Sequence, residues 1–188
     1  KKNFLDLVKR QKEVVEDLIK NRKLSIKNRK YKLITKSFIA TCLTRCKEYS
    51  DNKMSNVMSN IIKEYLPVLA EHNDYYGIFA LTYEYYCGTT SFPQDRVKAL
   101  KYALIAYEME EDPDIANTLG YIYYYGGANN GVPNYDLAFK YFSLAFHAGY
   151  NIESAYKVAD CFLKGNGTPK SERAAYNIVD SLYNYTRN

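Results

Sequence analysis

The fold is decided by the stretch Ala116-Asn117-Thr118-Leu119-Gly120-Tyr121-Ile122-Tyr123-Tyr124-Tyr125-Gly126. Its pattern of small, apolar and aromatic positions occurs in two further copies, at a period of about 38 residues. The earlier copy contains Ile78, Leu81, Tyr85 and Gly88. The later copy contains Ala155, Val158, Ala159, Phe162 and Gly165. A fixed period of this length is typical of a solenoid of helical hairpins, in which each repeat packs against its neighbours.

Each copy continues with a loop, a proline and a second apolar segment. The prolines are Pro93, Pro133 and Pro169, and we expect each in the first turn of a helix, where its missing N–H costs nothing. An alanine follows five or six residues later and begins a stripe at helical spacing: Ala99, Tyr102, Ala103, Ala106 and Tyr107; then Ala138, Tyr141, Phe142, Ala145 and Phe146; then Ala174, Ile178, Ser181 and Leu182. The spacing predicts helices over 74–87, 94–110, 114–125, 134–148, 152–164 and 170–185.

This pattern resembles the Sel1-like repeats, relatives of the tetratricopeptide repeats, with a consensus of roughly A-x-x-L-G-x-x-Y-x-x-G, a short loop and A-x-x-Y-Y-x-x-A-A-x-x-G. The middle copy fits best, and the first departs most because Thr82 replaces the helix glycine. The resemblance covers about residues 73–188. It implies an all-α solenoid of antiparallel helical hairpins, wound as a right-handed superhelix. It also implies a protein–protein interaction scaffold rather than an enzyme.

The N-terminal part lacks the repeat pattern but is also predicted to be helical. Apolar stripes predict helices over about 2–21, 31–49 and 53–69, carried by Phe4, Val8, Val15, Leu18 and Ile19, by Ile34, Phe38, Cys42 and Cys46, and by Met54, Met58, Ile61, Tyr65 and Leu69. We therefore divide the chain into a basic amphipathic segment (1–36), a divergent hairpin or cap (37–72) and three repeats (73–188). Terminal repeats of solenoids are usually atypical because one face meets water.

Positive charge is concentrated in residues 1–36, where 13 Lys and Arg face 4 Asp and Glu, whereas the whole chain carries +5. Such a segment could neutralise phosphates, so the alternative function is a fragment of a nucleic-acid-associated regulator whose repeats sense a peptide or dimerise. A solvated helix face and linker would explain the same charge. No helix-turn-helix or zinc pattern accompanies the basic run, so sequence-specific readout has no support.

Patterns for catalysis, metals and cofactors are lacking, and we expect none of the three. Cys42, Cys46, Cys87 and Cys161 match neither a disulfide framework nor a zinc site, so we interpret them as reduced thiols in a cytoplasmic protein. Neither His72 nor His147 stands near a cysteine or another histidine in the sequence. The glycine-rich loop 126–131 lacks the Gly-Lys-Ser/Thr end of a phosphate loop. No apolar stretch is long enough for a membrane span, and the start at Lys1 without methionine suggests part of a longer protein.

The partner-binding face follows from the expected arrangement. In tetratricopeptide-like arrays the first helix of each pair lines the concave face, so its side away from the core should bind a peptide or protein segment. That side carries Phe79, Tyr83 and Tyr86, then Asn117, Tyr121, Tyr124 and Tyr125, then Tyr156, Asp160 and Lys164. Tyrosine provides a large contact area with a polar tip, which suits recognition. In the competing interpretation, these tyrosines pack against the neighbouring repeat.

Overall fold

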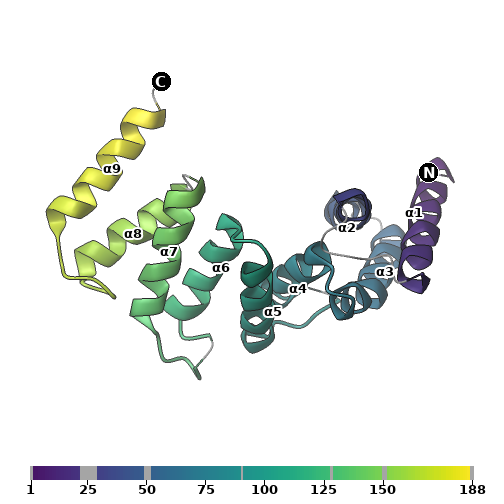
Figure 1. Ribbon diagram of the computed structural model, residues 1–188, viewed down its shortest axis with the longest axis horizontal. Coiled ribbons are helices and arrows are strands. Elements are labelled where there is room, and N and C mark those ends of the chain that lie inside the picture. The colour runs from purple at the N-terminus through teal and green to yellow at the C-terminus, as the bar shows by residue number, and fades with distance from the viewer. Residues whose placement is uncertain are drawn as a thin grey trace. The chain divides into compact units, whose positions relative to one another are not determined.

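The computed structural model describes residues 2–21, 29–48, 52–89, 91–127, 129–149 and 152–186, which form helices and no strands (Figure 1). The helices are α1 (Lys2–Lys20), α2 (Arg29–Glu48), α3 (Asn52–Glu71), α4 (Tyr75–Cys87), α5 (Arg96–Met109), α6 (Pro113–Tyr124), α7 (Tyr135–Gly149), α8 (Ile152–Lys164) and α9 (Glu172–Thr186). The predicted all-α fold is confirmed. Every predicted helix is present, with both ends within two residues of the expected positions.

The chain forms two compact units, Lys1–Asp95 and Arg96–Asn188. In the first unit, α2 packs on α1, α3 and α4, and α3 also packs on α4. Its core contains the fully buried side chains of Val15, Phe38, Met58 and Leu69. The side chains of Phe4, Cys46 and Met54, which we also predicted on these apolar stripes, lie outside the described residues. The division into 1–36, 37–72 and 73–188 stays a prediction.

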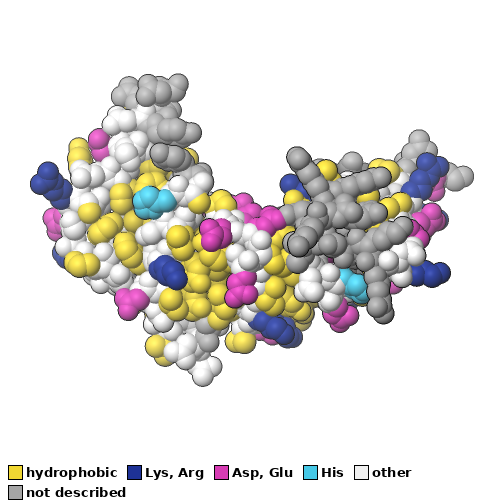
Figure 2. Space-filling model, in the orientation of Figure 1, with side chains coloured by type: hydrophobic (Ala, Val, Ile, Leu, Met, Phe, Trp, Pro, Cys, Tyr) yellow, Lys and Arg dark blue, Asp and Glu magenta, His cyan; other side chains and the backbone are white. Residues whose placement is uncertain are grey.

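The second unit packs each of its helices, α5 to α9, against the next one along the chain. Alanines at the contacts let the helix backbones approach closely: Ala99, Ala103, Ala106, Ala138 and Ala145 are all fully buried. Leu119 and Phe142 fill the space between the layers, with no exposed surface. In Figure 2, hydrophobic side chains gather over α6 and α7. The predicted burial of Leu119, Ala138, Phe142 and Ala145 is confirmed. Tyr123, which was predicted with them, is only half-buried and packs against the cluster that contains Ala138 and Phe142.

An equivalent backbone hydrogen bond is present in the turn of each of the three repeats. The residue just before the second helix donates its N–H to the carbonyl oxygen of an aromatic residue near the end of the first helix. The pairs are Asp95 to Tyr85 (2.8 Å), Asn134 to Tyr123 (2.9 Å) and Ser171 to Phe162 (2.9 Å). The aromatic residues of these pairs are the Tyr/Phe positions of the repeat, so equivalent backbone groups anchor each turn.

The register of the last helix differs from the prediction. The buried alanine lies four residues after the anchoring N–H, at Ala99, Ala138 and Ala175, and Ala175 is 3% exposed. Our choice of Ala174 was therefore wrong by one residue, and Ser181, also predicted on the stripe, is exposed. The cause is Lys170, which separates Pro169 from Ser171, whereas Asn134 follows Pro133 directly.

The prolines lie outside the helices that they precede. Those helices begin at Arg96, Tyr135 and Glu172, so Pro93, Pro133 and Pro169 stand two or three residues before them rather than in their first turns. Side-chain caps fix two of the starts instead. The Asn134 Oδ1 atom accepts a hydrogen bond from the Leu137 N–H at 3.0 Å, and the Ser171 Oγ atom accepts one from the Ala174 N–H at 3.2 Å.

The glycine of the middle repeat has a packing role. A Cβ atom added at Gly120 would lie 2.5 Å from the Cδ1 atom of Phe142, so the ring rests directly on the backbone of α6. The third repeat has Ala159 at this position, and the first has Thr82. The repeat therefore needs glycine where a large ring packs against the first helix.

Candidate functional site

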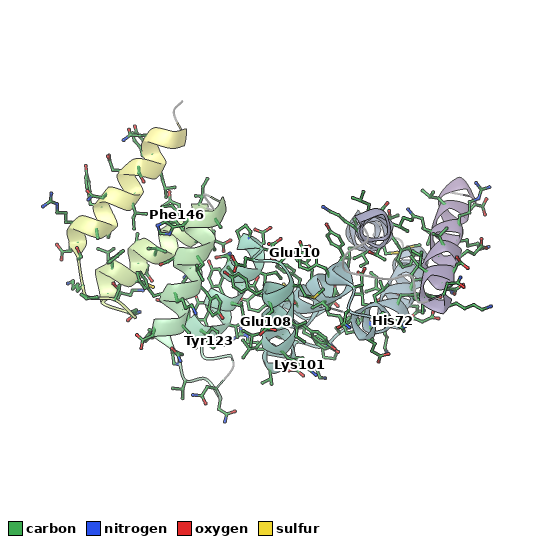
Figure 3. All side chains as sticks on the ribbon, viewed as in Figure 1. His72, Lys101, Glu108, Glu110, Tyr123 and Phe146 are labelled. Atoms are coloured by element: carbon green, nitrogen blue, oxygen red, sulfur yellow. The ribbon has the colours of Figure 1, made fainter. Side chains whose placement is uncertain are left out.

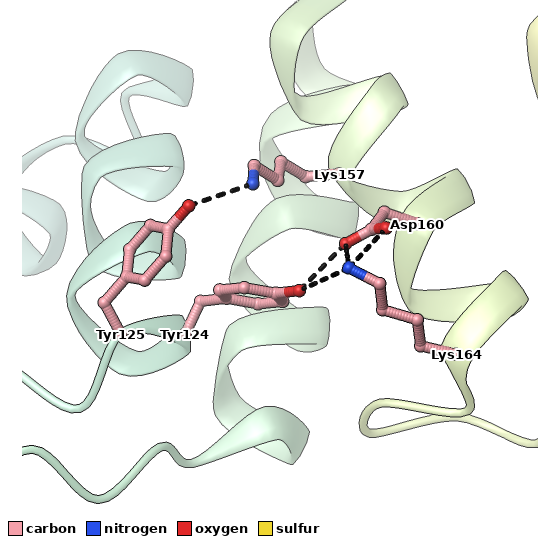
Figure 4. Close-up of polar contacts among 5 residues, drawn as sticks. All are labelled: Tyr124, Tyr125, Lys157, Asp160 and Lys164. Carbon is pink, nitrogen blue, oxygen red and sulfur yellow. Dashed lines mark hydrogen bonds and ion pairs between the residues drawn. The ribbon is translucent and has the colours of Figure 1, made fainter.

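In the second unit, α6 and α8 present side chains to each other across one face. We call this face the tyrosine–lysine surface and define it by Tyr121, Tyr124, Tyr125, Tyr156, Lys157, Asp160 and Lys164. Tyr121 and Tyr124 come from α6, Tyr125 is its C-cap, and the other four residues lie on α8. Figure 4 shows five of these residues and their polar contacts.

Two carboxylates of α8 accept hydrogen bonds from tyrosine hydroxyls of α6. The Tyr124 hydroxyl donates to the Asp160 Oδ2 atom at 2.8 Å, and the Tyr121 hydroxyl donates to the Glu153 Oε1 atom at 2.6 Å. Lys164, one turn after Asp160, forms an ion pair with it at 2.9 Å. The two bonds from tyrosine to carboxylate cross from one repeat to the next and fix the tyrosine rings in place, and Figure 4 shows the one between Tyr124 and Asp160.

The ammonium group of Lys157 lies over three tyrosine rings. Its Nζ atom is 4.8 Å from the ring centroid of Tyr124, 5.1 Å from that of Tyr121 and 5.5 Å from that of Tyr125. The same atom donates a long hydrogen bond of 3.4 Å to the Tyr125 hydroxyl. Distances below about 6 Å to a ring centroid allow attraction between a cation and the ring face.

The ionisation of the site follows from these contacts. Burial raises the pKa of Tyr124, and its hydrogen bond to Asp160 raises that pKa further. Partial burial acts to raise the pKa of Asp160, but hydrogen bonds from Lys164 and Tyr124 outweigh it and lower that pKa. At neutral pH the phenol is therefore a neutral donor, and the carboxylate is charged.

The predicted site residues of the second unit range from exposed to buried. Tyr125 and Tyr156 are 51% and 55% exposed, so a partner can reach their rings. Asn117, in contrast, is only 9% exposed, and its Oδ1 atom accepts a hydrogen bond from the Ser154 hydroxyl at 2.8 Å. It therefore links two repeats and offers little surface to a partner. Tyr121 and Tyr124 are half-buried and contribute both to inter-repeat contact and to the surface.

The three predicted residues of the first repeat lie on α4, in the other unit. Phe79, Tyr83 and Tyr86 are all half-buried. The rings of Phe79 and Tyr83 are 5.0 Å apart, and Tyr75 lies 5.8 Å from Phe79. They form an aromatic row along one helix, and their part in binding stays a prediction.

Sequence reasoning missed two members of this region, Lys157 and Glu153. The predicted residues of α8, Tyr156, Asp160 and Lys164, follow a spacing of four residues. Lys157 stands three residues before Asp160 and therefore falls outside that series. Lys157 and Lys164 are seven residues apart, so they share a helix face. That spacing was the available signal, but the reach of the lysine across to α6 could not be predicted from it.

Other candidate features have structural explanations. Nδ1 of His72 lies 2.8 Å from the Val68 carbonyl oxygen, and Nδ1 of His147 lies 2.7 Å from that of Ser143, each four residues back along the chain. Cys42 and Cys161 are buried. Among the described residues, no three metal-ligating side chains come together, and no helix is long and apolar enough to cross a membrane.

The acidic cluster at the end of α5 and the glycine-rich loop 126–131 form hydrogen bonds close by in the chain. Glu108 and Glu110 lie at the end of α5 (Figure 3), and Asp112 of the same acidic cluster caps α6 by accepting hydrogen bonds from the N–H groups of Asp114 and Ile115. In the glycine-rich loop, the N–H groups of Gly127, Asn129 and Gly131 donate to carbonyl oxygens of α6 and of the loop itself. Most of the basic run at 20–32 lies outside the described residues.

Comparisons with known proteins agree with the repeat pattern. The family model of the Sel1 repeat matches residues 75–110, 116–150 and 152–177, which together make up more than half of the chain. These segments correspond to α4 with α5, α6 with α7, and α8 with the start of α9. No curated protein matches the chain. A solved structure of a Sel1 repeat protein from Oxalobacter formigenes is similar at 16% identity and a TM-score of 0.35; the match covers 75% of this chain and 50% of that chain.

Proposed function

The chain belongs to the Sel1 repeat family, and we propose that it is an interaction scaffold that binds a peptide or protein segment on the tyrosine–lysine surface. Sel1 repeats are commonly protein–protein interaction scaffolds, which supports the class of function. The observation that carries the proposed location is the set of bonds between α6 and α8, which fix tyrosine rings at a surface that solvent reaches. A surface whose side chains are already ordered loses less entropy when a partner binds.

The chemistry of the surface favours an uncharged or mixed-charge segment. Glu153 and Asp160 balance Lys157 and Lys164, so the surface has no strong net charge. Tyrosine rings supply most of the contact area, and their hydroxyls supply polar contacts at low entropic cost. We therefore expect the partner to contribute aromatic or aliphatic side chains and backbone polar groups.

Two exposed tyrosines provide the test. Peptides would be selected from a random display library against the full chain, and their affinities would be measured by calorimetry for variants Tyr125→Ala and Tyr156→Ala. We expect each substitution to weaken binding about tenfold or more, which is the effect of a hot-spot side chain. The melting temperature should change little, because both rings are more than half exposed.

The chain offers a matched control on α9. Tyr176 is 69% exposed and lies outside the tyrosine–lysine surface, so Tyr176→Ala should leave peptide affinity unchanged. Selected peptides that bind all three variants as tightly as the unaltered chain would reject this surface as the binding site. Equal loss in all three would mean that the peptides recognise tyrosine in general.

We propose a separate recognition role for Phe79, Tyr83 and Tyr86 within the first unit, since they occupy the equivalent positions of the first repeat. The nucleic-acid alternative rests on the charge of residues 1–36 alone. Heparin retention that disappears when residues 1–36 are removed would favour it. Retention that is unchanged by the deletion would remove its support.

A further inference from the structure

The three rings around Lys157 form a site of a recognisable kind. We call the rings of Tyr121, Tyr124 and Tyr125 the tyrosine cage. The rings of Tyr121 and Tyr125 are nearly parallel, 6.1 Å apart with an angle of 5°, while the Tyr124 ring meets that of Tyr125 edge to face at 5.1 Å and 77°. A cation enclosed by several aromatic faces is the arrangement by which proteins bind ammonium groups.

Carboxylates beside the cage strengthen its attraction for positive charge. Tyr121 donates its hydroxyl proton to Glu153, and Tyr124 donates to Asp160. Each of these two carboxylates accepts a hydrogen bond from a ring hydroxyl of the cage, and the pKa of Asp160 is lowered by its hydrogen bonds from Lys164 and Tyr124, against the opposing effect of burial. Lys164 already forms an ion pair with Asp160, so this carboxylate does not depend on Lys157 for its countercharge.

Lys157 occupies the cage without strong polar anchoring. Its hydrogen bond to the Tyr125 hydroxyl is long, at 3.4 Å, and its side chain is half-buried (Figure 4). Lysine has a flexible four-carbon stem and a strongly hydrated head group, so it can leave the rings for water at low cost. A more weakly hydrated cation would lose less solvation on entering the same rings.

We propose that the tyrosine cage binds a quaternary ammonium group carried by the partner, such as the side chain of a trimethylated lysine, and that Lys157 is its internal competitor. The inference rests on the proposed function, since the group would belong to the segment docked on the tyrosine–lysine surface. The surface would then distinguish methylated from unmethylated segments. A trimethylated lysine of the partner would displace Lys157 from the cage, whereas an unmethylated lysine would not.

The test uses the full chain and tetramethylammonium chloride as the probe. Tyrosine ring resonances would be followed by NMR during titration, against sodium chloride at the same ionic strength. Lys157→Ala empties the cage and should tighten binding of the probe about three- to thirty-fold, the range expected when a cation–ring contact no longer competes. Adding Tyr125→Ala to Lys157→Ala should remove that gain. Lys157→Gln, which also removes the charge, should tighten binding in the same direction.

A matched control is available on α7. Lys140 lies 5.5 Å from the ring centroid of Tyr141, outside the cage, so Lys140→Ala should leave binding of the probe unchanged. Equal affinity of the probe for the unaltered chain and for both Lys157 variants would overturn the proposal. A gain that survives Tyr125→Ala would also overturn it, since the rings would then not be the site.

A second arm distinguishes a partner's side chain from a free small molecule. A short peptide containing trimethyllysine, the same peptide with unmodified lysine, and choline would be compared on the Lys157→Ala variant. Preference for the trimethylated peptide over both others supports a partner's side chain, and equal binding of choline and that peptide would overturn this assignment. If neither Lys157 variant binds the probe more tightly, but Tyr125→Ala and Tyr156→Ala still weaken binding of the library-selected peptides, the cage proposal fails and the proposed function stands.

Discussion

Replacing Gly120 by alanine should destabilise the second unit, although alanine is the better helix former. The added Cβ atom would lie 2.5 Å from Cδ1 and 2.6 Å from Cε1 of Phe142. Carbon atoms in contact are separated by about 3.5–4.0 Å, so the ring would have to move by about 1 Å. Phe142 has no exposed surface and contacts the rings of Tyr121 and Tyr124, at centroid distances of 5.1 and 6.2 Å, so it cannot move without disturbing them.

The expected magnitude combines two opposing effects. Overpacking of a buried site costs about 1–3 kcal/mol. Alanine in place of glycine within a helix returns about 1 kcal/mol. The free energy of unfolding should therefore fall by roughly 0–2 kcal/mol, a range too close to zero to decide the matter by itself.

A double-mutant cycle with Phe142→Ala separates the two effects. When the Phe142 ring is absent, the new Cβ atom at position 120 has no ring to clash with. Gly120→Ala should then raise the free energy of unfolding by about 1 kcal/mol, the difference in helix propensity alone. The coupling between the two substitutions should therefore be about 1–3 kcal/mol. Amide hydrogen exchange in α6 and α7, measured under native conditions, reports this unit separately from the rest of the chain.

The control is a second, smaller truncation. Phe142→Val, which copies the residue Val179 at the equivalent position of α9, keeps part of the core filled if Phe142→Ala leaves too little stability to measure. The reasoning would be refuted if Gly120→Ala changed the stability equally in all backgrounds, to within about 0.5 kcal/mol. That result would mean that the glycine serves the backbone rather than the ring.

Three further predictions concern the core of the second unit. Leu119→Ala should lower the free energy of unfolding by about 2–5 kcal/mol, because Leu119 is fully buried; a loss below about 1 kcal/mol in urea denaturation would contradict the packing. Ala138→Leu and Ala145→Leu should each cost about 1–3 kcal/mol by overpacking, and unchanged melting temperatures would count against this. Burial raises the pKa of the Cys161 thiol from 9.0 to about 11, so the stability tied to its protonated form is complete below pH 9 and is lost as the pH rises to 11. At pH 8, Cys161 should resist a thiol reagent while the exposed Cys87 reacts, and equal rates would contradict its burial.

Helices were predictable because each one repeats its apolar positions at a fixed spacing. Leu81, Leu119 and Val158 are aligned in the three copies, and all three are buried. The register of α9 could not be predicted from the proline before it, because this proline stands at a variable distance from the helix in the three repeats. The side-chain cap at Asn134 or Ser171 and the backbone bond to Tyr123 or Phe162 fix the register, and these depend on three-dimensional closure of the hairpin.

The candidate site was only partly predictable for a related reason. Tyr125 and Tyr156, chosen by helical spacing, are both more than half exposed, and their part in binding stays a prediction. Helical spacing could not show that Tyr124 contacts Asp160, 36 residues later, or that Lys157 contacts the ring of Tyr125, 32 residues earlier. Such contacts join residues of different helices. Long side chains that cross between repeats are fixed by the distance between helices, which a one-dimensional pattern does not contain.

Because the same tyrosines join the repeats and form the surface, stability and binding are coupled in this unit. Tyr121 and Tyr124 use their hydroxyls on α8 and their ring edges on Phe142, so their loss would weaken the fold and the surface together. A double substitution at these two positions cannot separate the functions, although sequence spacing alone would favour it. Tyr156 is 55% exposed and Tyr125 is 51% exposed, whereas the tyrosine rings in contact with Phe142 are those of Tyr121 and Tyr124. Binding that depends on these two residues, without a change in melting temperature, is therefore the evidence that would establish recognition as a property of the surface distinct from the packing beneath it.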